Sequence, residues 1–123
     1  MNDSKPKDPR KQTGASGEQL AKTFLESKGY RCLHQNWSMG RGDIDLIMDC
    51  EKTLVFVEVK TRSALVPIED MGPSKKQVSH LFELAERYLE KFPPQGEVRF
   101  DLVFVTNRIG RAEILHLEHG LSC

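Results

Sequence analysis

The sequence lacks any long run of apolar residues. No stretch approaches the roughly 18 consecutive apolar residues of a membrane-spanning helix. The amino-terminal residues 1–7 also lack the apolar segment of a secretory signal peptide. These absences exclude a helical membrane protein and a secreted precursor. They predict a cytoplasmic protein with no membrane partner.

Cysteine is scarce. Cys32, Cys50 and Cys123 are odd in number and widely spaced. A disulfide framework needs paired cysteines and a structural zinc site needs closely spaced ones, so both are excluded. We expect the three thiols to be reduced.

An excess of charge of either sign is also missing. Eighteen Lys and Arg residues balance eighteen Asp and Glu residues, so the net charge is zero. A neutral chain has no overall field that draws it onto a polyanion, and nucleic-acid binding would have to use a local basic patch. Acidic metal ligands would account for part of the balance, because a bound ion offsets their charge.

The length of 123 residues indicates one domain with a single modest core. Residues 1–15 hold almost no apolar side chains and contain Pro6, Pro9 and Gly14, which predicts a disordered arm. Basic residues of this arm could touch phosphates or simply remain solvated. The predicted folded domain comprises residues 16–123.

Periodicity and capping signals predict two helices and five strands. Each helix opens with a capping box. The boxes are Ser16 with Gln19 and Ser74 with Gln77. Gly29 ends the first helix and Pro93 the second. The predicted strands cover residues 30–37, 43–50, 54–61, 98–106 and 112–118. This order fits an α/β fold in which helices flank a central mixed five-stranded sheet.

The second predicted strand separates apolar from acidic residues. Ile44, Leu46 and Met48 fall on one face of the strand by alternation. Asp43 and Asp45 fall on the other face. We therefore expect one apolar and one acidic face.

The third predicted strand is nearly continuously apolar, as a central strand covered on both faces should be, but two charged residues interrupt it. Glu58 and Lys60 lie on the same face, about 7 Å apart along the strand. If this strand pairs with the preceding one as a hairpin, Asp45 lies about 5 Å from its neighbour across the pair. Two carboxylates and an ammonium group would then converge at one end of a sheet.

Such a convergence is costly unless the carboxylates share a cation. Asp and Glu oxygens suit Mg²⁺ or Mn²⁺, which keep several waters and take only one or two protein carboxylates. The pattern therefore predicts that Asp45 and Glu58 bind Mg²⁺ (or Mn²⁺) and that Lys60 orients a water or holds a phosphate. The alternative is a solvated strand end at which Glu58 and Lys60 simply pair.

Other charged residues flank this cluster. Glu18 falls on the inward side of the first turn of the first helix, where it could serve the site or merely complement the helix dipole. Lysines open the second helix, whose free N–H groups favour anions, although solvated first-turn lysines are also ordinary. We expect four basic residues to contact nucleic acid: Arg41, Arg62, Lys75 and Lys76.

Several motifs lie between Ser16 and His119. They are Gly17-Glu18, Asn36, Gly42-Asp43-Ile44-Asp45-Leu46-Ile47, Phe56-Val57-Glu58-Val59-Lys60-Thr61-Arg62, Lys76 and Arg99-Phe100-Asp101. Together they resemble the YraN family of small bacterial proteins, and Asp45 followed by Glu-x-Lys resembles the PD-(D/E)xK signature of nucleases. The chain departs from the family at Asp43, where members more often carry Glu, and no Pro precedes Asp45.

The resemblance implies a restriction-endonuclease-like core, similar to that of archaeal Holliday junction resolvases. It implies that Asp45 and Glu58 hold a divalent metal and that Lys60 is the catalytic lysine. Glu18 matches a helix acid close to that site. The implied activity is Mg²⁺-dependent cleavage of branched or structured DNA by a homodimer. Two alternatives stay open: a catalytically silent accessory protein that binds nucleic acid, and an RNA-directed nuclease.

Overall fold

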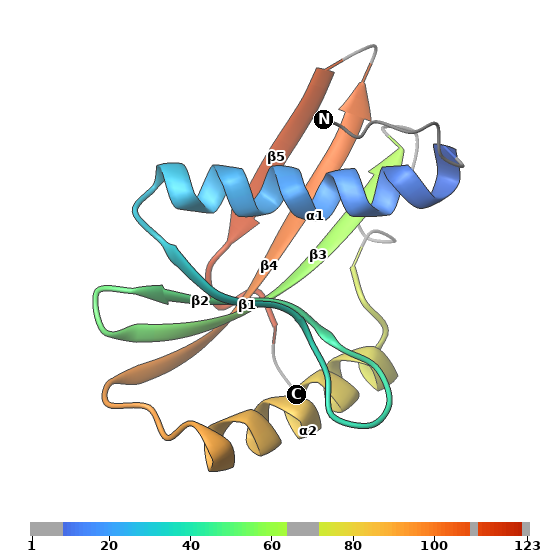
Figure 1. Ribbon diagram of the computed structural model, residues 1–123. Helices are drawn as coiled ribbons and strands as arrows, with labels where there is room; N and C mark the ends of the chain where they lie inside the picture. Colours follow the sequence, from blue (N-terminus) through green and yellow to red (C-terminus); the bar gives the residue numbers. More distant parts are fainter. Residues whose placement is uncertain (1–8, 64–71, 109–110, 122–123) are drawn as a thin grey trace, which may run out of the picture.

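The computed structural model describes residues 9–63, 72–108 and 111–121. Two helices and five strands follow one another along this part of the chain, in the predicted order (Figure 1). They are α1 (Pro9–Ser27), β1 (Arg31–Trp37), β2 (Ile44–Cys50), β3 (Thr53–Ser63), α2 (Lys75–Lys91), β4 (Glu97–Arg108) and β5 (Arg111–Leu117).

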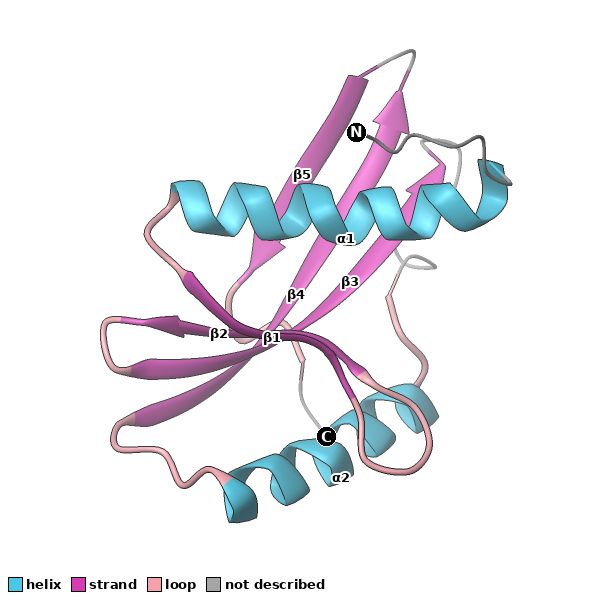
Figure 2. Cartoon of the chain, in the orientation of Figure 1, coloured by secondary structure: helices cyan, strands magenta, loops and turns pink. Residues whose placement is uncertain are grey.

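The strands form one sheet in the order β1-β2-β3-β4-β5. Strands β1, β2 and β3 are antiparallel neighbours, β3 and β4 are parallel, and β4 and β5 are antiparallel. Because parallel neighbours need a crossover connection, the chain passes through α2 between β3 and β4. Helix α1 covers one face of the sheet and α2 the other (Figure 2). The predicted α/β fold with a central mixed sheet between helices is confirmed.

Strand β3 is buried on both faces, which explains its nearly continuous apolar sequence. The core between the sheet and α1 consists of Ala21, Leu25, Tyr30, Leu46, Met48, Val55, Val57, Val59, Val103 and Val105. The core between the sheet and α2 consists of Ile44, Ile47, Phe56, Val78, Leu81, Leu84, Ala85, Tyr88, Leu102, Phe104 and Leu121. Alternate residues of β3 therefore serve two different cores.

Helix α1 begins earlier than predicted. Its backbone is helical from Pro9, so Ser16 lies inside the helix and the start predicted there is wrong. Proline fits the first turn of a helix, because its missing N–H would have no helical partner there. The arm predicted over residues 1–15 thus includes helical residues, and its first eight lie outside the described part of the chain. Gly29 follows the end of α1, as predicted, with a left-handed φ of 97°.

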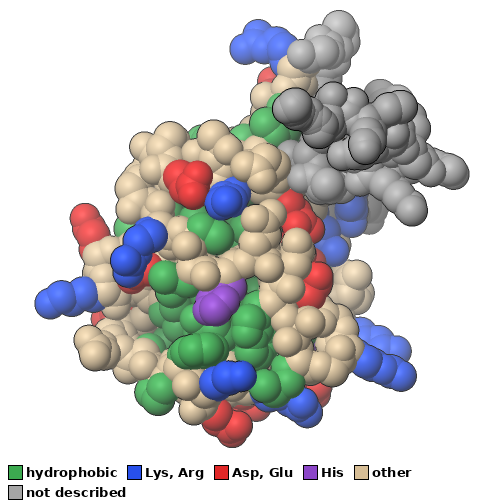
Figure 3. All heavy atoms as spheres, in the orientation of Figure 1, with side chains coloured by type: hydrophobic (Ala, Val, Ile, Leu, Met, Phe, Trp, Pro, Cys, Tyr) green, Lys and Arg blue, Asp and Glu red, His purple; other side chains and the backbone are tan. Residues whose placement is uncertain are grey.

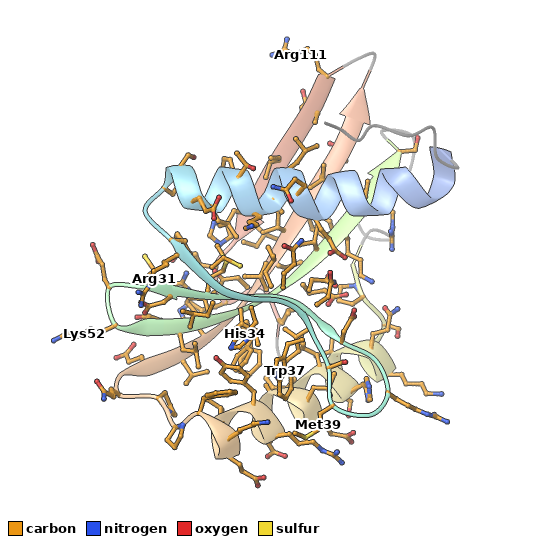
Figure 4. All side chains as sticks on the ribbon, in the orientation of Figure 1. Arg31, His34, Trp37, Met39, Lys52 and Arg111 are labelled. Carbon is orange, nitrogen blue, oxygen red and sulfur yellow. The ribbon has the colours of Figure 1, made fainter. Side chains whose placement is uncertain are left out.

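Helix α2 opens with the predicted capping box. Ser74 Oγ accepts the Gln77 N–H at 3.1 Å, and Gln77 Oε1 accepts the Ser74 N–H at 2.9 Å. The helix packs against edge strand β1 through Tyr88. His34 and Trp37 point toward α2 (Figure 4), and their rings lie 5.3 Å and 5.2 Å from the Tyr88 ring. Hydrophobic side chains gather over this junction in Figure 3.

The described cysteines are free thiols. Cys32 and Cys50 are both half-buried, and Cys123 lies outside the described residues. Over the described ranges, neither helix combines the length and the apolar character that crossing a membrane requires.

Asp101 of β4 is a charged residue without any exposed surface. Arg99 donates to both of its carboxylate oxygens at 2.8 Å, and His116 Nε2 lies 2.7 Å from Oδ2. The His119 N–H donates a further bond at 3.1 Å, and Arg99 also donates to the Tyr30 hydroxyl at 2.6 Å. Burial alone would raise the pKa of Asp101, but these hydrogen bonds outweigh burial and lower the pKa to about 2. The cluster ties β4 to β5 and to the segment after α1.

We expect Asp101→Asn to destabilise the fold by about 3–5 kcal/mol, because it removes the buried anion of the largely buried Arg99 guanidinium and leaves it with the exposed Glu118 at 3.7 Å. Asp49→Asn is the matched control, since Asp49 forms a 2.9 Å ion pair with the exposed Arg31. That loss should cost below about 1 kcal/mol. Denaturant unfolding at neutral pH measures both. Equal effects would contradict a structural role for the buried cluster.

The same cluster makes the stability of the fold depend on pH. The folded pKa of Asp101, about 2, lies below its ordinary value of 3.8. Its contribution is therefore present above the ordinary pKa and is lost as the pH falls through the folded pKa. The stability difference between wild type and Asp101→Asn should shrink over that acidic interval.

Candidate active site

Strands β2 and β3 separate at Asp45. Their ladder ends at the pair of Leu46 and Val57. Beyond this pair, Asp45 Oδ2 accepts a hydrogen bond from the Val59 N–H at 2.8 Å. The end of pairing also breaks the alternation of β2, because Ile44 packs in the α2-side core whereas Leu46 packs in the α1-side core. The prediction that Ile44 and Leu46 share a face is therefore wrong.

Glu58 and Lys60 lie together near the carboxyl end of β3, on one face as predicted. Lys60 Nζ is 3.1 Å from Glu58 Oε2. Their side chains are only 12% (Lys60) and 17% (Glu58) exposed, so they do not form the solvated strand end that was the alternative. Both follow Phe56 at every second residue and thus lie on the α2 side of the sheet. A largely buried ion pair is costly to desolvate, which marks this position as a candidate site.

The Asp45 carboxyl lies in an unfavourable electrostatic environment. Burial raises its pKa to about 8, and the Glu58 carboxylate is the second cause. The hydrogen bond from Val59 acts in the opposite direction without offsetting burial. Negative charge on Glu18 and Asp43 raises the pKa further. A cation placed among these carboxylates would reverse the shift.

Glu18 reaches the site from the middle of α1 and not from its first turn, so the helix dipole does not explain it. The preceding Gly17 lies against Thr61, where any side chain would meet the threonine hydroxyl, and this close packing sets α1 beside the end of β3. Asn36 Nδ2 donates to Glu18 Oε1 at 3.0 Å and holds the carboxylate. Asn36 has a left-handed φ of 52°, a conformation in which asparagine is enriched. Its contact with Glu18 was not predicted.

Arg41 and Lys76 line one hollow of about 510 Å³, which we call the basic hollow. The other residues that line it are Ser74, Gln77, Ser79, His80 and Glu83. His80 Nε2 lies 2.9 Å from the Arg41 carbonyl oxygen and links α2 to the turn after β1. Gly42 permits this approach, because a side chain there would strike the His80 ring.

The two other basic residues predicted to contact nucleic acid lie apart from the basic hollow. Lys75 lines a second hollow, whose other lining residues include Val78, Leu102 and Leu121. Arg62 is half-buried and donates to the Thr61 carbonyl oxygen at 2.9 Å. The structure thus brings together Arg41 and Lys76, but not all four residues.

The side chains around Asp45 fit Mg²⁺ better than zinc. Asp45 and Glu58 offer hard oxygen ligands, and the negative charge of Glu58 adds to the burial that raises the pKa of Asp45. Within the described ranges, no three His, Cys, Asp or Glu side chains are arranged to hold a metal ion. Zinc sites use three or four such protein ligands. Mg²⁺ needs only one or two carboxylates, because it keeps several waters.

The raised pKa of Asp45 should make the fold less stable as the pH rises. An acid whose folded pKa exceeds its unfolded value favours folding in its protonated form, so this contribution is lost between 3.8 and about 8. We expect Asp45→Asn, measured in EDTA, to remove a fall of at most about 1.4 kcal/mol per pH unit. At a pH near the folded pKa of about 8, the melting temperature of the Asp45→Asn variant should exceed that of wild type.

Glu86→Gln is the matched control for this measurement, because Glu86 is exposed on α2 and is not among the groups that act on Asp45. It should keep the pH dependence of the wild-type protein. Parallel stability curves for wild type and Asp45→Asn would show that the folded state does not hold the Asp45 proton.

Among solved structures, Pyrococcus furiosus SfsA in complex with Ca²⁺ shows a weak likeness to this chain. The TM-score is 0.36 at 17% sequence identity, over 94% of this chain and 66% of that chain. A likeness of this size supports no conclusion about fold or function.

Sequence comparisons give a clear relationship. The model of the uncharacterised protein family UPF0102 matches residues 17–105. A UPF0102 protein from Chlorobium phaeobacteroides (strain BS1) is 39% identical over 115 residues, which cover 86% of this chain and 88% of the relative. One from Bifidobacterium longum (strain NCC 2705) is 38% identical over 89% of this chain and 93% of the relative. The chain therefore belongs to the UPF0102 family, which is the YraN family that its motifs resemble.

Proposed function

We propose that this protein is a Mg²⁺-dependent endonuclease that cleaves branched or otherwise structured DNA. The observation that supports it most is the cluster of Asp45, Glu58 and Lys60 at the end of the β2–β3 ladder. In Figure 1 the amino-terminal part of α1, the carboxyl end of β3 and the start of α2 lie on the same side of the molecule. Carboxylates, a lysine and phosphate-binding groups on one side suit phosphodiester hydrolysis.

Each residue of the cluster has a separate role in this reaction. Asp45 and Glu58 would hold Mg²⁺, which supplies charge neutralisation at the phosphate and lowers the pKa of a water. The Val59 N–H fixes one oxygen of Asp45 and so orients the carboxylate. Lys60 lies 3.1 Å from Glu58 and would donate to a phosphate oxygen or align the attacking water.

Structured DNA suits this protein better than long duplex. A net charge of zero gives little long-range attraction to a polyanion, so recognition must come from local contacts. Arg41 and Lys76 in the basic hollow would supply such contacts. A four-way junction presents two equivalent strands, so paired cuts require a symmetric homodimer, which we place in the cytoplasm.

A second function, an accessory protein that binds nucleic acid without cutting it, is favoured by one observation. Lys60 and Glu58 already neutralise each other at 3.1 Å, so the pair could serve the fold alone. Both functions require binding at the basic hollow. Only the nuclease function requires metal-dependent strand scission, and a cleavage assay therefore separates them.

We expect the wild-type protein to cut a labelled four-way junction with Mg²⁺ or Mn²⁺ and not with EDTA. Lys60→Ala should lower the rate on the order of 10²-fold or more, because it removes a donor to the developing charge. Lys52→Ala is the control, since Lys52 is exposed at the opposite end of β3 (Figure 4). Matched duplex, single-stranded DNA and structured RNA, tested in parallel, identify the substrate.

Two results would overturn parts of this assignment. If the wild-type protein binds the junction, and binds metal by calorimetry, yet cuts no substrate, the accessory function is correct. If Lys60→Ala cuts as fast as wild type, Lys60 has no place in the mechanism.

We expect Arg41→Ala and Lys76→Ala each to weaken nucleic-acid binding. Each should also reduce the steepness of the plot of log K against log salt concentration by about one. Each substitution removes one cation from the basic hollow. Lys91→Ala is the matched control, because Lys91 lies in the last turn of α2. Fluorescence anisotropy over a salt series gives the slopes. Unchanged slopes in both variants would place the nucleic acid elsewhere on the surface.

A further inference from the structure

The second hollow, which we call the apolar hollow, lies beside the start of α2. Its volume is about 670 Å³, within the range of roughly 300–1,000 Å³ that small-ligand pockets occupy. Its apolar lining residues include Pro73, Val78, Leu102 and Leu121, and its polar side chains are Lys75 and Ser79.

The apolar hollow adjoins the candidate active site. Leu102 is in register with Glu58 in the parallel β3–β4 ladder. Side chains at paired positions of neighbouring strands share a face of the sheet, so the Leu102 wall is the direct neighbour of Glu58. Ser79 lines the basic hollow as well, so the two hollows meet at the first turns of α2.

Gly120 shapes the apolar hollow. A Cβ at Gly120 would lie 2.8 Å from the Leu117 carbonyl oxygen and 3.0 Å from the Leu102 Cβ. A residue without a side chain therefore lets the chain pass closely over Leu102. Leu121 then packs in the α2-side core.

The chemistry around the apolar hollow indicates its occupant. The walls are mostly aliphatic, and Lys75 is the charged residue among the lining side chains. Arg41 and Lys76 lie beyond Ser79 in the basic hollow. An apolar cavity bordered by cations complements a nucleotide, whose base is flat and uncharged and whose phosphates are anionic.

We propose that the apolar hollow receives an unpaired nucleobase next to the phosphate to be cut, while Lys75 and the basic hollow bind the flanking phosphates. This inference rests on the nuclease function proposed above. The substrate class would then be nucleic acid with an unpaired base at the cleavage position. Taking a base out of a duplex costs least where the base is already unpaired. The lining offers few hydrogen-bonding groups, so selection is for structure and not for base sequence.

The test uses a set of forked DNAs, each with 2-aminopurine at one nucleotide near the branch point. The fluorescence of 2-aminopurine rises when this base leaves the stack, so the set reports which base is unstacked. The titrations are done in EDTA and require no cleavage. We expect emission to rise at one position when wild-type protein binds. Replacing that nucleotide by an abasic analogue should weaken binding to wild-type protein, since the hollow then receives no base.

Gly72→Trp tests the same hollow from the protein side. Gly72 lines it, and a Cβ there would meet no atom within 4 Å, so a bulky side chain can be introduced at its rim without displacing the core. We expect this variant to lose the emission rise. Gly72→Ala is the matched control and should keep it, and thermal unfolding checks that both variants fold.

Binding without an emission rise at any position, or a rise that survives Gly72→Trp, would overturn the base site and leave the nuclease function standing if cleavage occurs. An emission rise lost in Gly72→Trp, together with no cleavage under any metal condition, would keep the base site and refute the nuclease function. No binding of the fork at all would refute both.

Discussion

The burial of β3 on both faces is the constraint on which the rest of the structure depends. Helices α1 and α2 cover opposite faces of this strand, so its middle accepts only apolar side chains. Strand β3 pairs with β4 from Thr53 to Ser63, but with β2 only as far as Val57. Within the described part of the chain, its last residues therefore pair with a strand on one side only. The N–H of Val59 needs a partner on the other side, and the Asp45 carboxylate provides it.

Two aspartates of the same sheet show how a buried carboxylate acquires opposite properties. Asp101 is fully buried, yet Arg99 and His116 surround it with donors, and its pKa falls to about 2. Asp45 has too few donors to offset its burial, and burial together with the neighbouring carboxylates raises its pKa to about 8. In the first arrangement, hydrogen-bond donors compensate the carboxylate charge, and the cluster stabilises the fold. The second is incomplete without a cation, as expected of a site that binds one.

The sequence predicted the elements well, because periodicity, capping and turn residues are local signals. The capping box of Ser74 and Gln77 and the turn at Gly29 were found in this way. The start of α1 was missed, because a residue that can cap, Ser16, lies inside a helix that begins with Pro9. Proline and serine are both common at the start of a helix, so residue type alone does not choose between the two positions.

The candidate site was predicted in part. Alternation along one strand placed Glu58 and Lys60 together, since it needs no knowledge of the neighbouring strands. The predicted face of Ile44 was wrong, because the alternation of side chains fails where β2 and β3 separate. No residue type in the sequence marks that point. The contact between Asn36 and Glu18 joins elements 18 residues apart and could not be read from spacing. Long-range geometry of this kind requires the fold.

The site's own charge bears on how a neutral protein could act on DNA. Glu18, Asp43 and Glu58 act on Asp45 as negative charges, so the unmetallated site would repel a phosphodiester. The cations that could offset this repulsion lie at the start of α2 and in the turn after β1, where Arg41 and Lys76 line the basic hollow. Acidic and basic side chains are interspersed on the face shown in Figure 3, without a broad field of one sign. Nucleic acid would therefore be held at the edge of the site by few contacts and drawn into it only when a cation neutralises the carboxylates. If the protein acts as proposed, metal binding and substrate binding would strengthen each other, and the shape of the substrate would decide which phosphate reaches Lys60.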